Sequence, residues 1–213
     1  MTNQARTLVA AVLLLLAPLA SVPVGAAEPQ RPATVVPEGL PAQDKEMLTL
    51  ALEVSRRCSD TREKWVAAKE VSEDRLFSFL YYPMPNTDPP KFTTDYDKLS
   101  DRDILPIEEG ALAKSSALAF VVLVDRFGYL PTHNQRYSQP LTGNAAADLV
   151  NNRTKRIFND RTGLAAARSE APFLIQRYQR DTGEAMIDLS VPVYVHGTHW
   201  GAVRIGYRLV EAK

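Results

Sequence analysis

The 213-residue sequence contains one cysteine, Cys58, and no long apolar run after residue 27. A single cysteine cannot form an internal disulfide, so the fold must be stable through its hydrophobic core alone. About 180 residues suffice for this, because a domain of ~150 residues already buries close to 70% of its unfolded surface. The absence of a second apolar run predicts that the chain does not cross a membrane again after its N-terminal segment.

The sequence also lacks an excess of charge of either sign, since 25 lysine and arginine residues are balanced by 25 aspartate and glutamate residues. It contains no basic run and no interleaving of basic with aromatic residues. Nucleic-acid-binding proteins need a basic footprint for the phosphate backbone. The composition therefore argues against nucleic acid as a partner.

Motifs typical of enzymes are missing. The sequence has no Gly-x-Ser-x-Gly turn, no glycine-rich phosphate loop and no paired carboxylates at an informative spacing. We expect a protein that is not an enzyme. A hydrolase built from scattered Asp, His and Ser residues stays open as an alternative, because such triads are defined by geometry.

Histidine is scarce, with His133, His196 and His199 as its three occurrences. A structural zinc site needs four nitrogen or sulfur ligands and a catalytic site three, yet no helical pair of ligands supports these residues and Cys58 is distant in sequence. The Cys-x-x-Cys-His run that attaches haem is absent as well. We expect no cofactor and no metal, and a haem- or metal-binding sensor is kept as an alternative.

The N-terminus has the pattern of a secretory signal peptide. Arg6 precedes an apolar run from Leu8 to Ala17, and Gly25-Ala26-Ala27 offers the small residues that signal peptidase requires. We expect residues 1–27 to be a cleaved signal peptide and the mature protein to be periplasmic or secreted. A single uncleaved N-terminal anchor is the alternative, because the uncharged stretch is nearly long enough to span a bilayer.

After the signal peptide, the composition predicts a linker and a single domain. Residues 28–42 contain four prolines, which favour an extended linker, and residues 43–213 form the domain. Residues 43–79 lack proline and glycine, and their apolar residues recur three and four positions apart, as in one long amphipathic helix or two closely joined ones. A proline-rich loop is expected over 81–91 and a second helix over 96–114.

Strand patterns dominate the second half of the chain. Residues 117–124 are a continuous apolar run that suits a central strand, and a return strand is expected to begin at Tyr129. Further strands are expected over 173–180, 187–195 and 202–209, and the last two alternate apolar with polar residues.

Two short helices, over 144–151 and 162–168, are expected between these strands. Together the elements predict an α+β fold, in which the long N-terminal helix packs on the apolar face of an about five-stranded antiparallel sheet with short inserted helices. The segment 132–170 would then fold over the other face of the sheet. A small pocket is expected there.

Arg153 and Arg156 are the first candidates for ligand binding, because a planar guanidinium suits a small carboxylate or another anion. Salt bridges on a solvated surface are the alternative role for both. Trp200 could stack on a ligand or anchor the core. With the polar residues of the expected strands and loops, the candidate ligand-binding residues are His133, Tyr137, Arg153, Arg156, Tyr178, Asp188, Tyr194 and Trp200.

Several blocks of the sequence follow one another at consistent spacing: VDRFGYLPTHN at 124–134, NRTKRIF at 152–158, YQRDTGE at 178–184, DLSVPV at 188–193, and HWG with RIGY at 199–207. Together they resemble the periplasmic sensory domains of methyl-accepting chemotaxis proteins, over roughly residues 43–209. The resemblance implies a Cache-like domain, with a PAS-related sheet behind a long helix, that binds a small molecule and takes part in signal transduction.

Members of that family continue into a second transmembrane helix, a HAMP linker and a signalling coiled coil, whereas this sequence ends at Lys213. We therefore expect a stand-alone periplasmic binder whose partner is a small polar or anionic ligand. The alternative is an interaction module without a ligand, in which helix 43–79 pairs with a second copy or with a membrane receptor.

Overall fold

The computed structural model describes residues 35–179, 183 and 185–208. The expected signal peptide, residues 28–34 of the expected linker and most of the turn at 181–184 lie outside the described residues. Within the described part of the chain, no helix is both long and apolar enough to cross a membrane.

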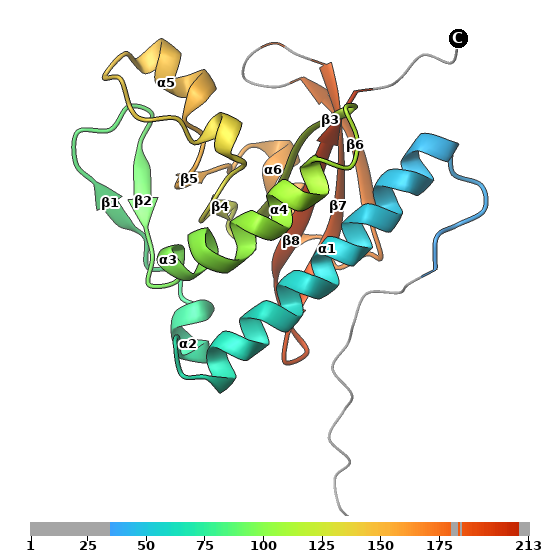
Figure 1. The fold of residues 1–213 in the computed structure, drawn as a ribbon, viewed down its shortest axis with the longest axis horizontal. Helices are drawn as coiled ribbons and strands as arrows, with labels where there is room; N and C mark the ends of the chain where they lie inside the picture. Colours follow the sequence, from blue (N-terminus) through green and yellow to red (C-terminus); the bar gives the residue numbers. More distant parts are fainter. Residues whose placement is uncertain (1–34, 180–182, 184, 209–213) are drawn as a thin grey trace, which may run out of the picture.

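Helix α1 (Ala42–Ala67) is the long N-terminal helix, and it lies along one face of the central sheet (Figure 1). Its apolar stripe, which includes Met47, Val54 and Trp65, is buried against the sheet. The stripe that could have paired with another helix is thus used inside the domain. Its outward face carries charged residues that form ion pairs, such as Arg56 with Asp60 at 3.4 Å.

The predicted helix over 43–79 is two helices, one of the two expected arrangements. After α1 the chain turns through Lys69, which has a φ of 59°, and a short helix α2 (Glu73–Leu76) follows. A residue in this left-handed conformation ends a helix. No proline or glycine marks this turn in the sequence, because residues 43–79 contain neither.

The second predicted helix is present as one continuous helical segment. It consists of α3 (Asp97–Leu99), a π-helical turn (Ser100–Ile104) and α4 (Leu105–Leu112). Pro106 lies in the first turn of α4, directly after the π-helical turn. The proline-rich loop before this segment is part of a hairpin of β1 (Tyr82–Met84) and β2 (Lys91–Thr93).

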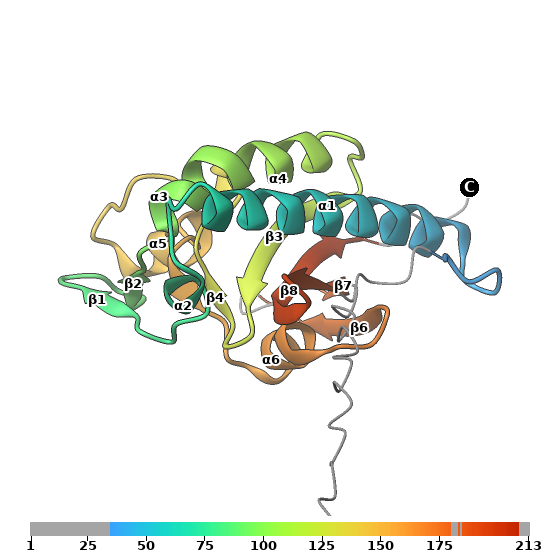
Figure 2. The same ribbon diagram turned by 90° about the horizontal axis from the view of Figure 1, so that it is seen from below.

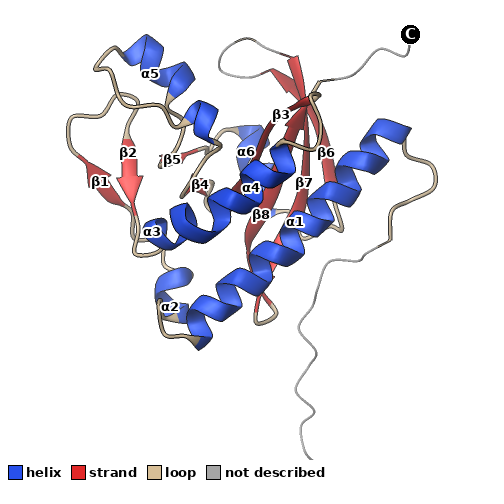
Figure 3. Ribbon diagram, viewed as in Figure 1, coloured by secondary structure: helices blue, strands red, loops and turns tan. Residues whose placement is uncertain are grey.

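The central sheet is antiparallel and has four strands in the order β3-β8-β7-β6. They are β3 (Leu118–Asp125), β6 (Leu174–Gln179), β7 (Ala185–Val195) and β8 (Thr198–Tyr207). The prediction of about five strands is corrected, because the return strand β4 (Tyr129–Leu130) leaves this sheet and pairs with β5 (Arg156–Ile157). The α+β class with a long helix on an antiparallel sheet is confirmed (Figure 3).

Strand β3 was predicted to be central, and the structure places it at an edge. The continuous apolar sequence of β3 does not reflect a central position in the sheet. It reflects burial, since every residue of β3 is buried. The outer edge is closed by side chains: Asn134 Oδ1 accepts from the Val121 N–H and Glu108 Oε1 accepts from the Leu123 N–H, both at 2.9 Å. A strand buried on both faces and capped along its edge has the composition of a central strand.

The two faces of the sheet are covered by different parts of the chain. Figure 2 shows α1 and α4 on one face and α6 (Arg161–Arg168) on the other. The first face carries the main hydrophobic core, and the second carries a smaller one around Phe120 and Val122. The segment that covers the second face also contains a 3-10 turn (Gln135–Tyr137) and α5 (Ala145–Asn151).

Candidate functional site

A cavity of about 320 Å³ lies between the second face of the sheet and the segment that covers it. This is where the sequence predicted a pocket. Strands β3, β6 and β8 form one wall, and the chain from β4 to the start of α6 forms the other. The lining residues are Phe120, Val122, Leu130, His133, Arg153, Phe158, Asp160, Thr162, Tyr178, Gln179 and Arg204.

The Phe120 ring is one wall of the cavity, and a glycine on the neighbouring strand makes room for it. Phe120 pairs with Gly206 in the register of β3 and β8. A Cβ at position 206 would lie 2.1 Å from Phe120 Cε1, far inside van der Waals contact. The ring therefore lies directly over the β8 backbone, and a larger residue at 206 would displace it.

An ion pair lies at the base of the cavity. Arg204 lines the cavity, and its Nε and Nη2 donate to Asp188 Oδ2 at 3.0 and 2.6 Å. Burial raises the pKa of Asp188, and the charge and hydrogen bonds of Arg204 oppose that rise. Asp188 Oδ1 accepts no hydrogen bond from the described residues, so the carboxylate depends on Arg204.

Arg153 and Arg156 stack on one aromatic ring. Their guanidinium carbons lie 5.2 and 5.0 Å from the Phe158 ring centroid, and each Nη1 donates to the Leu149 carbonyl at 3.3 Å. Arg153 lines the cavity and Arg156 is not among its lining residues. Arg153 thus brings one guanidinium to the cavity wall, and both groups have the arrangement of a cation–π contact.

His133 brings an imidazole to the same cavity. It is 3% exposed, and its ring lies 4.9 Å from that of Tyr137 and 6.2 Å from that of Phe120. Tyr137 thus supports His133 from behind the cavity wall. Ser138 Oγ donates to the His133 carbonyl at 2.9 Å and fixes the backbone of this turn.

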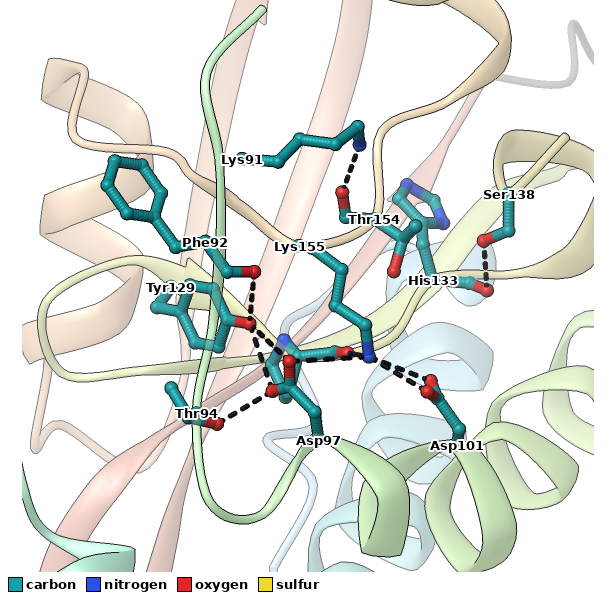
Figure 4. A network of polar contacts seen from close by, with 11 residues as sticks. Lys91, Phe92, Thr94, Asp97, Asp101, Tyr129, His133, Ser138, Thr154 and Lys155 are labelled. Atoms are coloured by element: carbon teal, nitrogen blue, oxygen red, sulfur yellow. Dashed lines mark hydrogen bonds and ion pairs between the residues drawn. The ribbon is translucent and has the colours of Figure 1, made fainter. Parts of the chain in front are cut away.

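A polar network ties the covering segment to the rest of the domain (Figure 4). Lys155 Nζ donates to the Pro131 carbonyl and lies 2.9 Å from Asp101 Oδ2. The Tyr129 hydroxyl donates to Asp97, and Lys91 Nζ donates to the Thr154 carbonyl. These bonds hold the wall that carries His133 and Arg153 against the helical layer.

The structure brings together six of the eight predicted site residues. His133, Arg153 and Tyr178 line the cavity, while Tyr137, Arg156 and Asp188 each contact a residue that does. Tyr194 and Trp200 lie elsewhere. The Tyr194 ring packs 5.5 Å from His199, away from the cavity, and the 1% exposed Trp200 is part of the core under α1.

A β-bulge explains the position of Trp200. Val193 pairs with Gly201 and Tyr194 pairs with His199, so Trp200 is an extra residue in β8. Side chains alternate between the two faces of a sheet, and one extra residue shifts this alternation, so that a side chain points to the opposite face. Trp200 is thereby turned toward α1 and α2, and its Nε1 donates to the Leu76 carbonyl at 3.0 Å. The alternation of apolar residues did not indicate this bulge.

Several lining residues were not predicted. Phe120 and Val122 could have been found from strand alternation, because they point away from the face that packs on α1. Asp160 carries a local signal, since its Oδ1 accepts from the N–H groups of Thr162 and Gly163 and caps α6. Its place at the cavity depends on the tertiary fold.

The described residues contain no group of three or more His, Cys, Asp or Glu side chains that could hold a metal ion. Cys58 is buried in the α1 stripe, and burial raises its pKa to about 12, which disfavours a reactive thiolate.

No protein-family model and no curated protein matches the sequence. Among solved structures, the chain is similar to an extracellular ligand-binding receptor from Desulfohalobium retbaense DSM5692, with a TM-score of 0.32 and 14% identity over 76% of this chain. The chain spans 25% of the length of that receptor. The geometry of the cavity, rather than this likeness, supports the function proposed below.

Proposed function

We propose that the chain is an exported, Cache-like sensory domain that reversibly binds a small polar or anionic molecule in the cavity and catalyses no reaction. The observation that carries this proposal is the cavity itself. It combines aromatic walls with guanidinium and imidazole groups on a rigid sheet, as binding sites for small molecules do.

The polar groups of the cavity suit a polar or anionic ligand. Asp188 neutralises Arg204, and Asp160 directs Oδ1 to the first N–H groups of α6. Arg153 adds a second guanidinium, which can donate two parallel hydrogen bonds to a carboxylate. His133 adds an imidazole to the same lining.

The size of the cavity limits the ligand. A volume of about 320 Å³ lies at the lower end of the range for ligand pockets, which begins at ~300 Å³. The rings of Phe120, Phe158 and Tyr178 suit an apolar or planar part of the ligand. Small organic acids, amino acids and purines meet these limits.

Thermal-shift screening of the purified protein against these three classes, followed by calorimetry, tests the proposal. We expect Arg153→Gln to weaken binding about tenfold or more, because a hydrogen bond to a charged group contributes ~1.5–3 kcal/mol. Arg57→Gln on the outer face of α1 is the matched control and should bind like the wild type.

Tyr178→Phe provides a second variant, so a folding defect in one variant does not decide the result. The absence of any thermal shift across the three classes would contradict the proposal. Equal affinity in Arg153→Gln and in wild type would remove Arg153 from the site. N-terminal sequencing of the mature protein tests whether export is accompanied by cleavage after Ala26 or Ala27.

A further inference from the structure

A second hollow, of about 470 Å³, lies at the end of the sheet where β8 begins. It is lined by Arg126 and Phe127 after β3, by Arg168 and Glu170 at the end of α6, and by Thr198 and His199 at the start of β8. Among the described residues, it shares no lining residue with the cavity discussed above.

Backbone contacts hold this hollow in shape. A Cβ at Gly201 would lie 2.1 Å from the Val124 carbonyl oxygen, so glycine lets β8 approach the end of β3 closely. The Arg126 N–H donates to the Trp200 carbonyl at 2.9 Å. Arg168 Nε donates to the Arg126 carbonyl at 3.3 Å, which holds the Arg168 side chain against the backbone of Arg126.

The charges of these two arginines are not neutralised by a neighbour. In the described part of the chain, no carboxylate oxygen lies within 4 Å of the Arg126 or Arg168 guanidinium, although Glu170 lines the same hollow. Some exposed arginines elsewhere are paired, as Arg75 is with Asp95 at 3.2 Å. Both arginines line the hollow, so an anion bound there would be attracted to two positive charges.

We propose that this hollow is a second binding site, which takes a small divalent oxyanion of the phosphate or sulfate type between Arg126 and Arg168. The planar guanidinium groups match the oxygen geometry of such an anion and can each donate two hydrogen bonds. Phe127 holds the Arg126 guanidinium, whose carbon lies 5.1 Å from the ring centroid. This site does not depend on the ligand of the cavity lined by Arg153 and Arg204.

His199 offers a built-in reporter of occupancy. Its ring lines the hollow, packs 5.5 Å from Tyr194, and has Nε2 without a hydrogen-bond partner among the described residues. Burial lowers its pKa, with a smaller lowering from Arg126, while Glu170 and a backbone hydrogen bond oppose the change. An anion bound beside the ring stabilises the protonated imidazole and raises its pKa.

The test is an NMR titration of the His199 imidazole in the purified full chain, with sodium sulfate compared against sodium chloride at equal ionic strength. Sulfate is the probe because it does not titrate in this range, and the chloride arm controls for screening. We expect sulfate to raise the His199 pKa more than chloride does. Arg126→Gln and Arg168→Gln should each weaken sulfate binding about tenfold.

Arg57→Gln, on the opposite side of the domain, is the charge-matched control and should retain wild-type sulfate affinity. Equal His199 pKa values in sulfate and chloride would overturn the proposal. So would unchanged sulfate affinity in the Arg126→Gln/Arg168→Gln double variant. Failure here leaves the first cavity untouched, because Arg153→Gln serves as an independent test there.

Discussion

The two faces of the central sheet differ in what they bury. Along β7, Ile187, Leu189 and Val191 face α1 and belong to the main core, whereas Asp188 and Ser190 face the side of the cavity. Both sets are almost completely buried. Because side chains alternate across a strand, one strand supplies a stabilising face and a polar face at the same time.

The largest loss of stability is expected on the polar face of the sheet, where Asp188 and Arg204 form a buried ion pair. Asp188→Ala leaves the Arg204 guanidinium buried without its partner, which should lower the free energy of unfolding by about 3–5 kcal/mol. Removing both charges in Asp188→Leu/Arg204→Met should restore most of the stability. Urea unfolding measures both changes.

The matched variant on the other face is Leu189→Ala, which removes a fully buried side chain next in sequence. It should cost about 2–5 kcal/mol and leave ligand affinity in the cavity unchanged. The proposed difference between the two faces would be wrong if Asp188→Ala lowered the free energy of unfolding less than Leu189→Ala and also kept full ligand affinity.

A smaller effect of opposite sign is expected for Arg62 on the apolar face. The Arg62 guanidinium is fully buried and stacks 3.8 Å from the centroid of the Trp200 ring, and none of its nitrogens has a hydrogen-bond partner among the described residues. Burial lowers its pKa. Arg62→Met should therefore raise the free energy of unfolding by about 1–4 kcal/mol, measurable as a higher Tm. A marked loss of stability would show instead that Arg62 offsets the charges of the buried Glu108 and Asp125.

The smallest expected effect concerns the capped edge of β3. Asn134→Ala would leave the Val121 N–H buried without an acceptor, at a cost of about 1–3 kcal/mol. Hydrogen exchange of the Val121 amide should speed up in this variant, while exchange of the Leu123 amide, capped by Glu108, should change less. Equal acceleration at both amides would indicate general loosening of the domain instead.

The sequence could predict the two faces because strand alternation is a local signal. The helices at 145–151 and 161–168 were likewise close to the predicted ranges, because Asn144 and Asp160 cap them. The site was predictable as far as it follows from this alternation and from polar loop residues such as His133 and Arg153.

Features that depend on contacts between distant segments escaped prediction. The bulge at Trp200 follows from how β8 pairs with β7, and the edge position of β3 follows from the caps that Asn134 and Glu108 provide. The apolar periodicity of a single segment cannot indicate either the bulge or the edge position, because both depend on contacts with other segments. The ring of Phe120 becomes a cavity wall only because Gly206 lies beside it on another strand.

The capped edge of β3 also bears on self-association. An open strand edge offers unpaired N–H and C=O groups to a second chain, and such edges seed aggregation. Here Asn134 and Glu108 occupy the Val121 and Leu123 amides, so a foreign strand would have to displace two fully buried side chains before it could add to β3. Growth of the sheet into an intermolecular ribbon is therefore blocked at this edge, and β6 is the edge that remains for such pairing.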